Sequence, residues 1–292
     1  MKDFEYYAPP SLQDAVSLKD KFKDAARFLA GGTDLVVQMK NDRVNPSVLI
    51  DIKRIPKLNR LEWKDGQLFI GAAVPLSKII NYAPIKQHFG VLHQACSSIG
   101  SLQLRNRGTM GGNICNAAPS ADSAPALLCL GSKAVLNGFG GTRRVPLENF
   151  FSGPGQTLIL SDEVLIGIEV PDPPPRSYGH YMKHIPRQCM DIAVASAASF
   201  LVFNSTDNTC SEARIALGAV APVPIRVPEA ENLLKGNKPL TSEIIESAAE
   251  KAAKCANPIS DVRSSASYRL ELIKVLVSRT LKMACHSQGI TI

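Results

Sequence analysis

The stretch Leu29-Ala30-Gly31-Gly32-Thr33-Asp34-Leu35 joins a short apolar run to two glycines, a hydroxyl side chain and a carboxylate. Glycine lets the backbone approach a ligand closely, and successive exposed N–H groups form a nest for an anion such as a phosphate. The same residues also fit a plain strand–turn–helix junction with Thr33 as the helix cap. The stretch matches neither GxGxxG nor the GK[ST] phosphate loop, so on its own it leaves both interpretations open.

A second glycine pair stands in residues 105–116, which read RNRGTMGGNICN. Thr109 precedes Gly111 and Gly112, and asparagine side chains surround them. We interpret the two glycine pairs as two loops that hold one diphosphate. An irregular loop that uses left-handed turns is the structural alternative. Residues 100–123 show little periodicity, so we expect a long loop there, and such loops are usually functional.

The flanking sequence predicts alternating strands and helices. Ser11 and Asp14 resemble a capping box at the start of an amphipathic helix with Leu12, Ala15, Val16 and Phe22 inward. The Asp65-Gly66 pair is a turn signal before a strand. In this half of the chain we expect strands at residues 27–30, 48–52, 67–73, 133–136, 144–147 and 163–170, and helices at 76–82 and 91–99.

The proline-rich run 171–175 is the strongest boundary signal in the chain. Beyond it, the pattern predicts an antiparallel sheet followed by two helices, the second with an apolar face. The expected strands span 180–185, 193–203 and 213–218, and the expected helices span 242–255 and 268–283. A length of 292 residues is also typical of about two domains.

Composition excludes several classes of protein. With 45% hydrophobic and 20% charged residues, the chain is not expected to be disordered, and its longest apolar run, 192–203, is too short to cross a membrane. The first residues, MKDFEYY, do not read as a secretory signal, so we expect a cytoplasmic protein. The net charge of +7 is dispersed, which argues against binding to nucleic acid.

Side chains for independent catalysis or metal binding are not apparent. The seven cysteines contain no CxxC pair, and the five histidines show no metal-ligand spacing. Neither a GxSxG motif nor a set of nucleophile, acid and base stands out. We therefore predict no catalytic residues and no metal site, and we expect any chemistry to come from a bound cofactor.

Taken together, AGGTDL at 30–35 and TMGGNICNAAPSADS at 109–123 resemble the FAD-binding subunit of molybdenum hydroxylases. This family includes xanthine dehydrogenase, nicotinate dehydrogenase and the medium subunit of aerobic CO dehydrogenase. The resemblance extends to IGSLQLRNRGT at 99–109, DEVLIGIEVP at 162–171 and ALGAVAPVPIR at 216–226, so it covers essentially the whole chain. The NICN and SADSAP stretches are most similar to bacterial three-subunit xanthine dehydrogenases, and the overall pattern is also similar to nicotinate dehydrogenase.

The resemblance implies an α+β fold. Residues 1–175 would form an FAD-binding domain of the PCMH type, with subdomains of about 1–55 and 56–175. Residues 176–292 would form a C-terminal domain like that of the CO dehydrogenase flavoprotein, with an antiparallel sheet and helices. In this arrangement FAD lies between the two subdomains and the C-terminal domain closes over the flavin.

The resemblance also implies the residues that hold FAD. Leu29 to Val36 match a first diphosphate loop, with Leu35 beside the isoalloxazine, and Thr109 to Asn113 match a second loop. Asp122 matches an acidic residue on the ribityl or ribose side. The complete implied set is Leu29, Ala30, Gly31, Gly32, Thr33, Asp34, Leu35, Val36, Ile99, Gly100, Thr109, Gly111, Gly112, Asn113, Asn116, Asp122, Leu165 and Lys183.

The implied function is electron transfer. A molybdenum-containing large subunit would hydroxylate a purine or another heterocycle, and a small iron–sulfur subunit would pass electrons to this FAD and on to an acceptor such as NAD. The complex would be a hetero-oligomer, up to a dimer of heterotrimers, and residues 187–191 would control access of the acceptor. The alternatives are a stand-alone FAD oxidoreductase and a structural subunit without flavin. The first lacks a credible base or nucleophile, and the two intact glycine pairs argue against the second.

Overall fold

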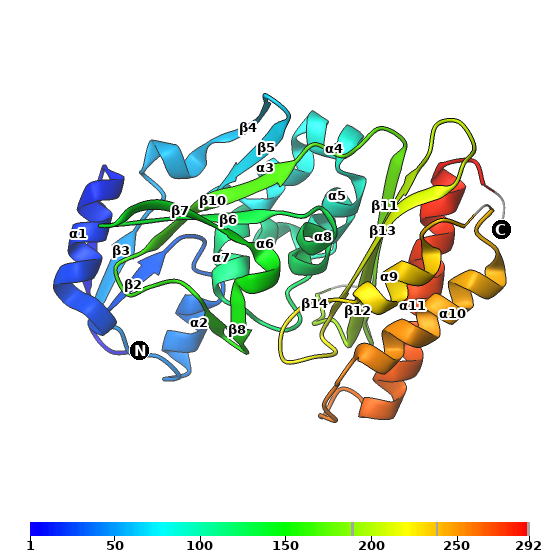
Figure 1. The fold of residues 1–292 in the computed structure, drawn as a ribbon. Helices are drawn as coiled ribbons and strands as arrows, with labels where there is room; N and C mark the ends of the chain where they lie inside the picture. Colours follow the sequence, from blue (N-terminus) through cyan, green and yellow to red (C-terminus); the bar gives the residue numbers. More distant parts are fainter. Residues whose placement is uncertain (188–189, 238, 291–292) are drawn as a thin grey trace.

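The computed structural model describes residues 1–187, 190–237 and 239–290. Its N-terminal part is a small parallel sheet in the order β1 (Glu5–Tyr7), β3 (Val48–Asp51), β2 (Ala26–Leu29), connected by helix α1 (Leu12–Phe22) (Figure 1). The Ser11 hydroxyl accepts the N–H of Asp14 at 3.1 Å and donates to its carboxylate at 2.6 Å, which confirms the predicted start of the helix. Helix α2 (Leu35–Lys40) follows β2.

A five-stranded antiparallel sheet forms the middle of the molecule. Its order is β4 (Leu61–Lys64), β5 (Gln67–Gly71), β10 (Val164–Pro171), β6 (Lys133–Gly138) and β7 (Gly141–Pro146). Asp65 and Gly66 both have positive φ, as a tight hairpin turn between β4 and β5 requires. The four strands expected in this region are confirmed, as β5, β6, β7 and β10. Smaller elements complete it, namely η1 (Lys23–Ala25), η2 (Pro56–Asn59), η3 (Leu147–Asn149), β8 (Phe151–Gly153) and β9 (Gln156–Thr157).

Short helices fill the region that the sequence predicted to be one long loop, so that prediction is wrong. Residues 100–123 contain α6 (Leu102–Arg107) and α7 (Met110–Cys115), and α8 (Ser123–Cys129) follows. Ser101 and Thr109 cap α6 and α7 by accepting backbone N–H groups. Each of these two helices has six residues, which is too short for a clear 3.6-residue pattern. Helices α3 (Leu76–Asn81) and α5 (Gly90–Ser97) were expected, and α4 (Ala83–His88) was not.

The C-terminal part is an antiparallel sheet covered by helices. Strands β11 (Ser177–His184), β12 (Ala195–Phe203), β13 (Cys210–Gly218) and β14 (Ile225–Arg226) pair in that order. The three longer strands and the helices α10 (Ser242–Cys255) and α11 (Ala266–Ser287) were predicted, whereas α9 (Pro228–Leu234) was not. In the described ranges, no helix is both long enough and apolar enough to cross a membrane.

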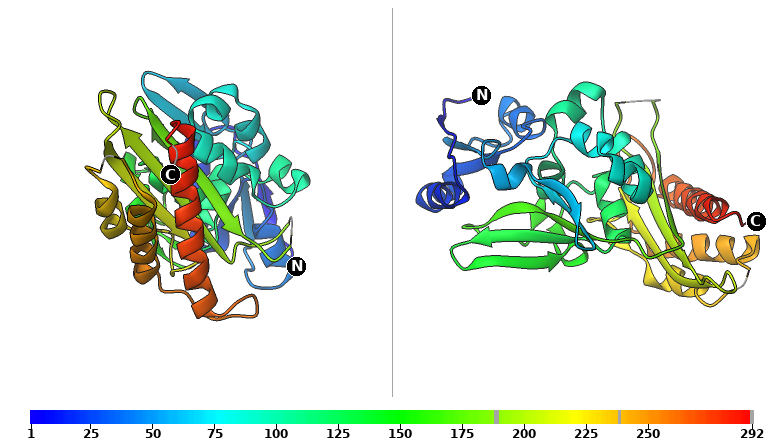
Figure 2. Two further views of the ribbon diagram at one scale, coloured as in Figure 1. Left: turned by 90° about the vertical axis from the view of Figure 1, so that its right-hand side faces the viewer. Right: turned by 90° about the horizontal axis from the view of Figure 1, so that it is seen from above.

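The C-terminal sheet also joins the two halves of the molecule. Helices α10 and α11 cover one face of the sheet, and α5 and α8 pack on the other face (Figures 1 and 2). Because both faces are covered, all nine residues of β12 are buried. Ala198 and Phe200 of β12 share one apolar core with residues of the middle sheet and its helices. The mixed fold predicted from the sequence is confirmed.

Candidate functional site

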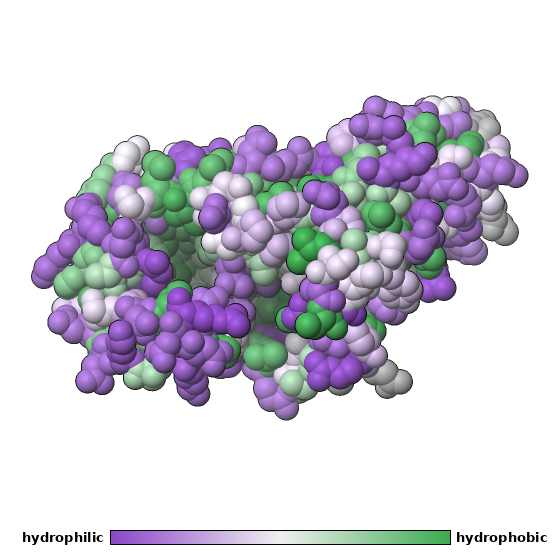
Figure 3. Space-filling view, turned by 90° about the horizontal axis from the view of Figure 1, so that it is seen from below, coloured by the Kyte–Doolittle hydropathy of each residue, from purple (hydrophilic) through white to green (hydrophobic). Residues whose placement is uncertain are grey.

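A cavity of about 780 Å³ lies where the two glycine-rich stretches meet, and one face of the molecule is hollowed with hydrophobic residues in and around the hollows (Figure 3). Its size falls within the range of about 300–1,000 Å³ that is typical of small-molecule and cofactor sites. The predicted residues that line it are Ala30, Gly31, Gly32, Thr33, Asp34, Leu35, Ile99, Gly100, Thr109, Gly111, Gly112, Asn113, Asn116, Asp122 and Leu165. Leu29, Val36 and Lys183 lie behind lining residues, against Gly32 or Asp122.

The first loop turns sharply between β2 and α2. Gly32 has φ of 77°, a left-handed conformation that glycine adopts without strain. A Cβ atom on Gly31 would overlap the carbonyl oxygen of Arg107, so the first loop packs directly on the start of the second. Within the described residues, the N–H groups of Gly32, Thr33 and Asp34 have no backbone acceptor. The loop therefore leaves three donors for a ligand.

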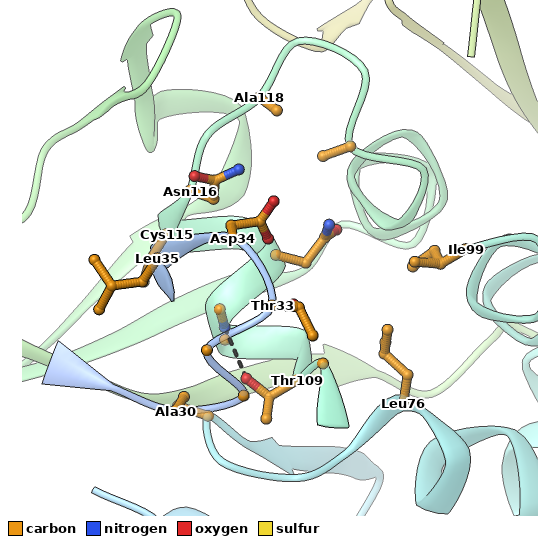
Figure 4. Close-up of a pocket in the computed structure, with 18 of the residues that line it drawn as sticks. Ala30, Thr33, Asp34, Leu35, Leu76, Ile99, Thr109, Cys115, Asn116 and Ala118 are labelled. Carbon is orange, nitrogen blue, oxygen red and sulfur yellow. Dashed lines mark hydrogen bonds between the residues drawn. The ribbon is translucent and has the colours of Figure 1, made fainter. Parts of the chain in front are cut away.

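The junction with α2 differs from the predicted cap. Asp34 rather than Thr33 occupies the cap position, and its side chain makes no capping hydrogen bond. Figure 4 shows Asp34 beside Asn116, Thr33 and Thr109 below them, and Ile99 and Leu76 across from this group. Burial raises the pKa of the Asp34 carboxyl above its ordinary value.

The second loop is organised around the start of α7. The Thr109 hydroxyl accepts the N–H of Gly112 at 3.0 Å (the dashed line in Figure 4), and its own hydrogen can still be donated. A Cβ atom on Gly111 would stand 2.6 Å from atoms of Ala72, so this glycine is required for packing against the chain after β5. A Cβ atom on Gly112 would meet the Thr109 hydroxyl alone within 4 Å. Gly112 is therefore the glycine of this pair that lies open at the cavity.

Asp122 stands at the start of α8 and is 7% exposed. Its two oxygens accept hydrogen bonds from β11: Oδ1 from the Tyr181 hydroxyl at 2.7 Å and Oδ2 from the Lys183 ammonium at 2.7 Å. Burial raises the pKa of Asp122, and the Lys183 charge and both hydrogen bonds oppose that rise. The predicted acidic residue is thus fixed by the C-terminal part of the molecule.

Several lining residues were missed by the sequence reasoning. The Gln38 amide donates to the Asn116 side chain at 3.2 Å and so ties α2 to the end of α7. Glu163 is buried at the cavity wall, and Arg143 lowers the pKa of its carboxyl through two hydrogen bonds of 2.5 and 2.8 Å. The apolar lining includes Leu76 and Leu104. For Gln38 alone a sequence signal existed, since it lies one helical turn after Asp34.

A second cavity of about 690 Å³ adjoins the first and shares Gly100 and Met190 with it. Arg105, His180 and Lys183 contribute to its lining. The predicted acceptor segment 187–191 borders both cavities through Met190, and Arg187 pairs with Asp191 at 3.1 Å. Residues 188 and 189 of that segment lie outside the described residues.

Cys115 is one of the titratable residues that line the cavity. Burial raises the pKa of the Cys115 thiol at the cavity wall to about 12, which keeps it protonated and unreactive. In the described part of the chain, no group of three or more His, Cys, Asp or Glu side chains is placed to hold a metal ion.

Free backbone donors, glycine-rich loops and a cavity of about 780 Å³ on a two-part α+β fold are typical of proteins that bind a phosphate-containing cofactor. Comparison with known proteins makes the family definite. Residues 2–173 match the FAD binding domain in molybdopterin dehydrogenase, and residues 180–284 match the CO dehydrogenase flavoprotein C-terminal domain. The chain therefore belongs to the family of FAD subunits of molybdenum hydroxylases.

Relatives match over nearly the full length. The chain is 33% identical over 292 residues to the xanthine dehydrogenase FAD-binding subunit of Escherichia coli O157:H7, with 99% of each chain covered. It is 32% identical to the nicotinate dehydrogenase FAD-subunit of Eubacterium barkeri, with 84% of each covered. The solved carbon monoxide dehydrogenase structure from Hydrogenophaga pseudoflava contains a chain with a TM-score of 0.93 and 34% identity, and 98% of each chain is covered. These relatives belong to complexes with different substrates.

Proposed function

We propose that the chain binds FAD in the first cavity and carries electrons from an iron–sulfur subunit to an acceptor. The observation that carries this proposal is the meeting of two glycine-rich loops at one cavity, where three backbone N–H groups of the first loop lack a backbone acceptor in the described chain. When bound, FAD supplies one- and two-electron redox chemistry that amino-acid side chains lack. The chain's own residues bind and orient it.

Each part of the cavity has a different task in this proposal. The N–H groups of Gly32, Thr33 and Asp34 donate to the diphosphate, and Gly112 leaves room for it. The Asp122 carboxylate accepts from a sugar hydroxyl of the cofactor. The apolar lining, with Ile99, Leu76 and Leu104, keeps water from the rings. Leu165 lies at the flavin end, and Lys183 acts through Asp122.

Relatives supply the proposed partners and substrate. We propose a complex with a molybdenum-containing large subunit and an iron–sulfur small subunit, with a purine such as xanthine as substrate and NAD as acceptor. The full-length similarity to a xanthine dehydrogenase subunit supports the purine, and the similarity to a nicotinate dehydrogenase subunit keeps nicotinate as the second candidate. The cavity at Met190 supports the binding of a dinucleotide acceptor beside the flavin.

Titration of the purified, FAD-free chain with FAD tests the cofactor proposal. We expect one FAD per chain, with the two visible absorption bands of an oxidised flavin. Failure to bind FAD, with a folded chain verified by circular dichroism, would contradict the proposal.

Co-expression with the two partner subunits tests the rest. The recovered complex is expected to contain molybdenum and iron and to reduce NAD with xanthine. If the complex turns over nicotinate but not xanthine, nicotinate replaces xanthine as the proposed substrate. If the complex reduces an artificial acceptor but not NAD, the proposed acceptor is wrong and the proposed binding of FAD still stands.

A further inference from the structure

One face of strand β11 holds Asp122, a residue that lines the cofactor cavity, while Tyr181 and Lys183 of that face line the adjoining second cavity. Side chains two positions apart on a strand share a face, so Gly179, Tyr181 and Lys183 point the same way. A Cβ atom on Gly179 would stand 3.0 Å from Cβ of Val91 in α5, so strand and helix meet as closely as a glycine permits. The next two residues on this face reach past α5 to Asp122.

The contacts of Tyr181 differ from those of Lys183. The Lys183 ammonium is shared between Asp122 and the backbone carbonyl of Ser98, at 2.7 and 2.8 Å. The Tyr181 side chain is buried, 5% exposed, and its hydroxyl donates to Asp122. The backbone N–H of Tyr181 donates to the Gln94 amide oxygen of α5 at 2.8 Å, which holds the strand in place. The carboxylate is thereby fixed by a rigid neutral donor and by a charge.

We propose that Tyr181 is a positioning residue for the cofactor: its hydroxyl fixes Asp122 in the orientation that accepts a hydroxyl group of FAD, and so links FAD binding to docking of the C-terminal domain. This inference rests on the proposed binding of FAD in the first cavity. A carboxylate has about four acceptor positions, and β11 occupies two of those of Asp122. Asp122 lines the cavity, so its remaining acceptor positions are available to a hydroxyl group of the cofactor. The FAD site is then incomplete without the C-terminal domain.

The substitution Tyr181→Phe tests this role, because it removes one hydroxyl at nearly constant shape. We expect the FAD dissociation constant of the purified chain to rise about tenfold, which corresponds to about 1.4 kcal/mol. Tyr178 lies on the opposite face of the same strand, against the helices of the C-terminal domain. Tyr178→Phe is therefore the matched control and is expected to leave FAD affinity unchanged.

A double-mutant cycle separates positioning from general loosening of the fold. If Tyr181 acts through Asp122, Tyr181→Phe will have no further effect on FAD affinity in a chain that already carries Asp122→Asn. Hydrogen exchange gives a second readout: FAD is expected to slow exchange of β11 amides in the wild-type chain and to slow it less in Tyr181→Phe.

Several results would overturn the inference. Unchanged FAD affinity in Tyr181→Phe, or fully additive effects with Asp122→Asn, would exclude a positioning role. If Tyr181→Phe does not fold, the Asp122→Asn variant decides whether the inference holds. In that variant FAD must bind more weakly and must no longer slow the hydrogen exchange of the β11 amides. A folded wild-type chain that binds no FAD would instead contradict the proposed function itself.

Discussion

The two glycine pairs look alike in the sequence, yet their members have different neighbours in the fold. Gly31 and Gly111, the first of each pair, face other backbone: Arg107 for Gly31 and Ala72 for Gly111. Gly32 and Gly112, the second of each pair, are the members with more room. Gly32 is needed for its left-handed φ, whereas Gly112 lies in the first turn of a helix. A glycine that lines a cofactor cavity can therefore be required by the protein, by the ligand, or by both.

This difference corrects one argument from the sequence. In the sequence, the two intact glycine pairs argue against a subunit without flavin. Gly31 and Gly111 are required for packing whether or not a cofactor binds, so their presence says nothing about FAD. The argument is left with Gly112, where a Cβ atom would meet one protein atom within 4 Å, the Thr109 hydroxyl oxygen at 3.0 Å.

The largest expected effect comes from the packed glycines. In Gly111→Ala the new methyl group would stand 2.6 Å from Ala72, and in Gly31→Ala it would overlap the Arg107 carbonyl, so backbone must move. We expect each substitution to lower the free energy of unfolding by about 3 kcal/mol, measured by urea denaturation of the FAD-free chain. Gly140→Ala is the control, since nothing lies within 4 Å of its Cβ position. Equal stability of Gly111→Ala and the control would refute the packing role.

Gly112→Val is expected to affect FAD affinity much more than the free energy of unfolding, unlike Gly31→Ala and Gly111→Ala. The FAD-free chain should lose much less stability than Gly111→Ala, because a Cβ atom at this position meets one side-chain atom, the Thr109 hydroxyl oxygen at 3.0 Å, and no backbone. FAD affinity should fall at least a hundredfold, about 2.7 kcal/mol, because the valine blocks approach of the diphosphate. The measurement is FAD titration beside urea denaturation, with Gly140→Val as the control. Full flavin occupancy in Gly112→Val would show that the second loop has another role.

Much of the fold could be predicted because its signals are local. The Ser11 cap, the Asp65-Gly66 turn and the alternating or continuous apolar runs each fix an element within a few residues. The six-residue helices α6 and α7 could not be predicted in the same way. Their caps at Ser101 and Thr109 are visible in the sequence, but six residues give too little periodicity to distinguish a helix from a loop.

The residues themselves predicted the site where they form short motifs, whereas the distant pair Asp122 and Lys183 came from the family resemblance and their contact did not. Both loops came from short motifs. Tyr181 was missed because it is 59 positions from Asp122, and the contact exists only when β11 docks on α5 and α8. Gln38 contacts Asn116 across 78 positions for the same reason. Such pairs depend on how the domains pack.

Gly32→Ala gives a smaller effect in which backbone strain is the main cause, because the new Cβ atom would meet side-chain atoms alone, the nearest being Leu29 Cδ1 at 3.1 Å. The φ of 77° at this position is strained for any residue with a Cβ atom. We expect the free energy of unfolding to fall by about 1–2 kcal/mol in urea denaturation. Gly32→Asn should lose less, because asparagine tolerates the left-handed region better than alanine. Equal losses for alanine and asparagine would point to a steric cause instead of strain.

The smallest expected effect concerns the two helix starts beside the glycines. Thr109 caps α7 with its side chain, whereas the Asp34 carboxylate does not cap α2, and burial raises its pKa. Between the unfolded value, about 4, and the raised folded value, the folded chain binds more protons than the unfolded chain. This carboxyl therefore lowers stability as the pH rises through that window. The asparagine side chain in Asp34→Asn cannot ionise, so this variant should not lose stability as the pH rises through that window.

The test of this sign is urea denaturation of the FAD-free wild-type and Asp34→Asn chains across a pH series that starts near the ordinary pKa of about 4. The variant's advantage should grow with pH and then become constant once Asp34 is fully ionised in the folded chain. Asp34 lines the cavity but stays open to solvent, which screens its charge, so the advantage should stay below about 1 kcal/mol. An advantage that does not vary with pH would contradict the raised pKa, and one that shrinks as the pH rises would mean that the folded chain stabilises the charged carboxylate.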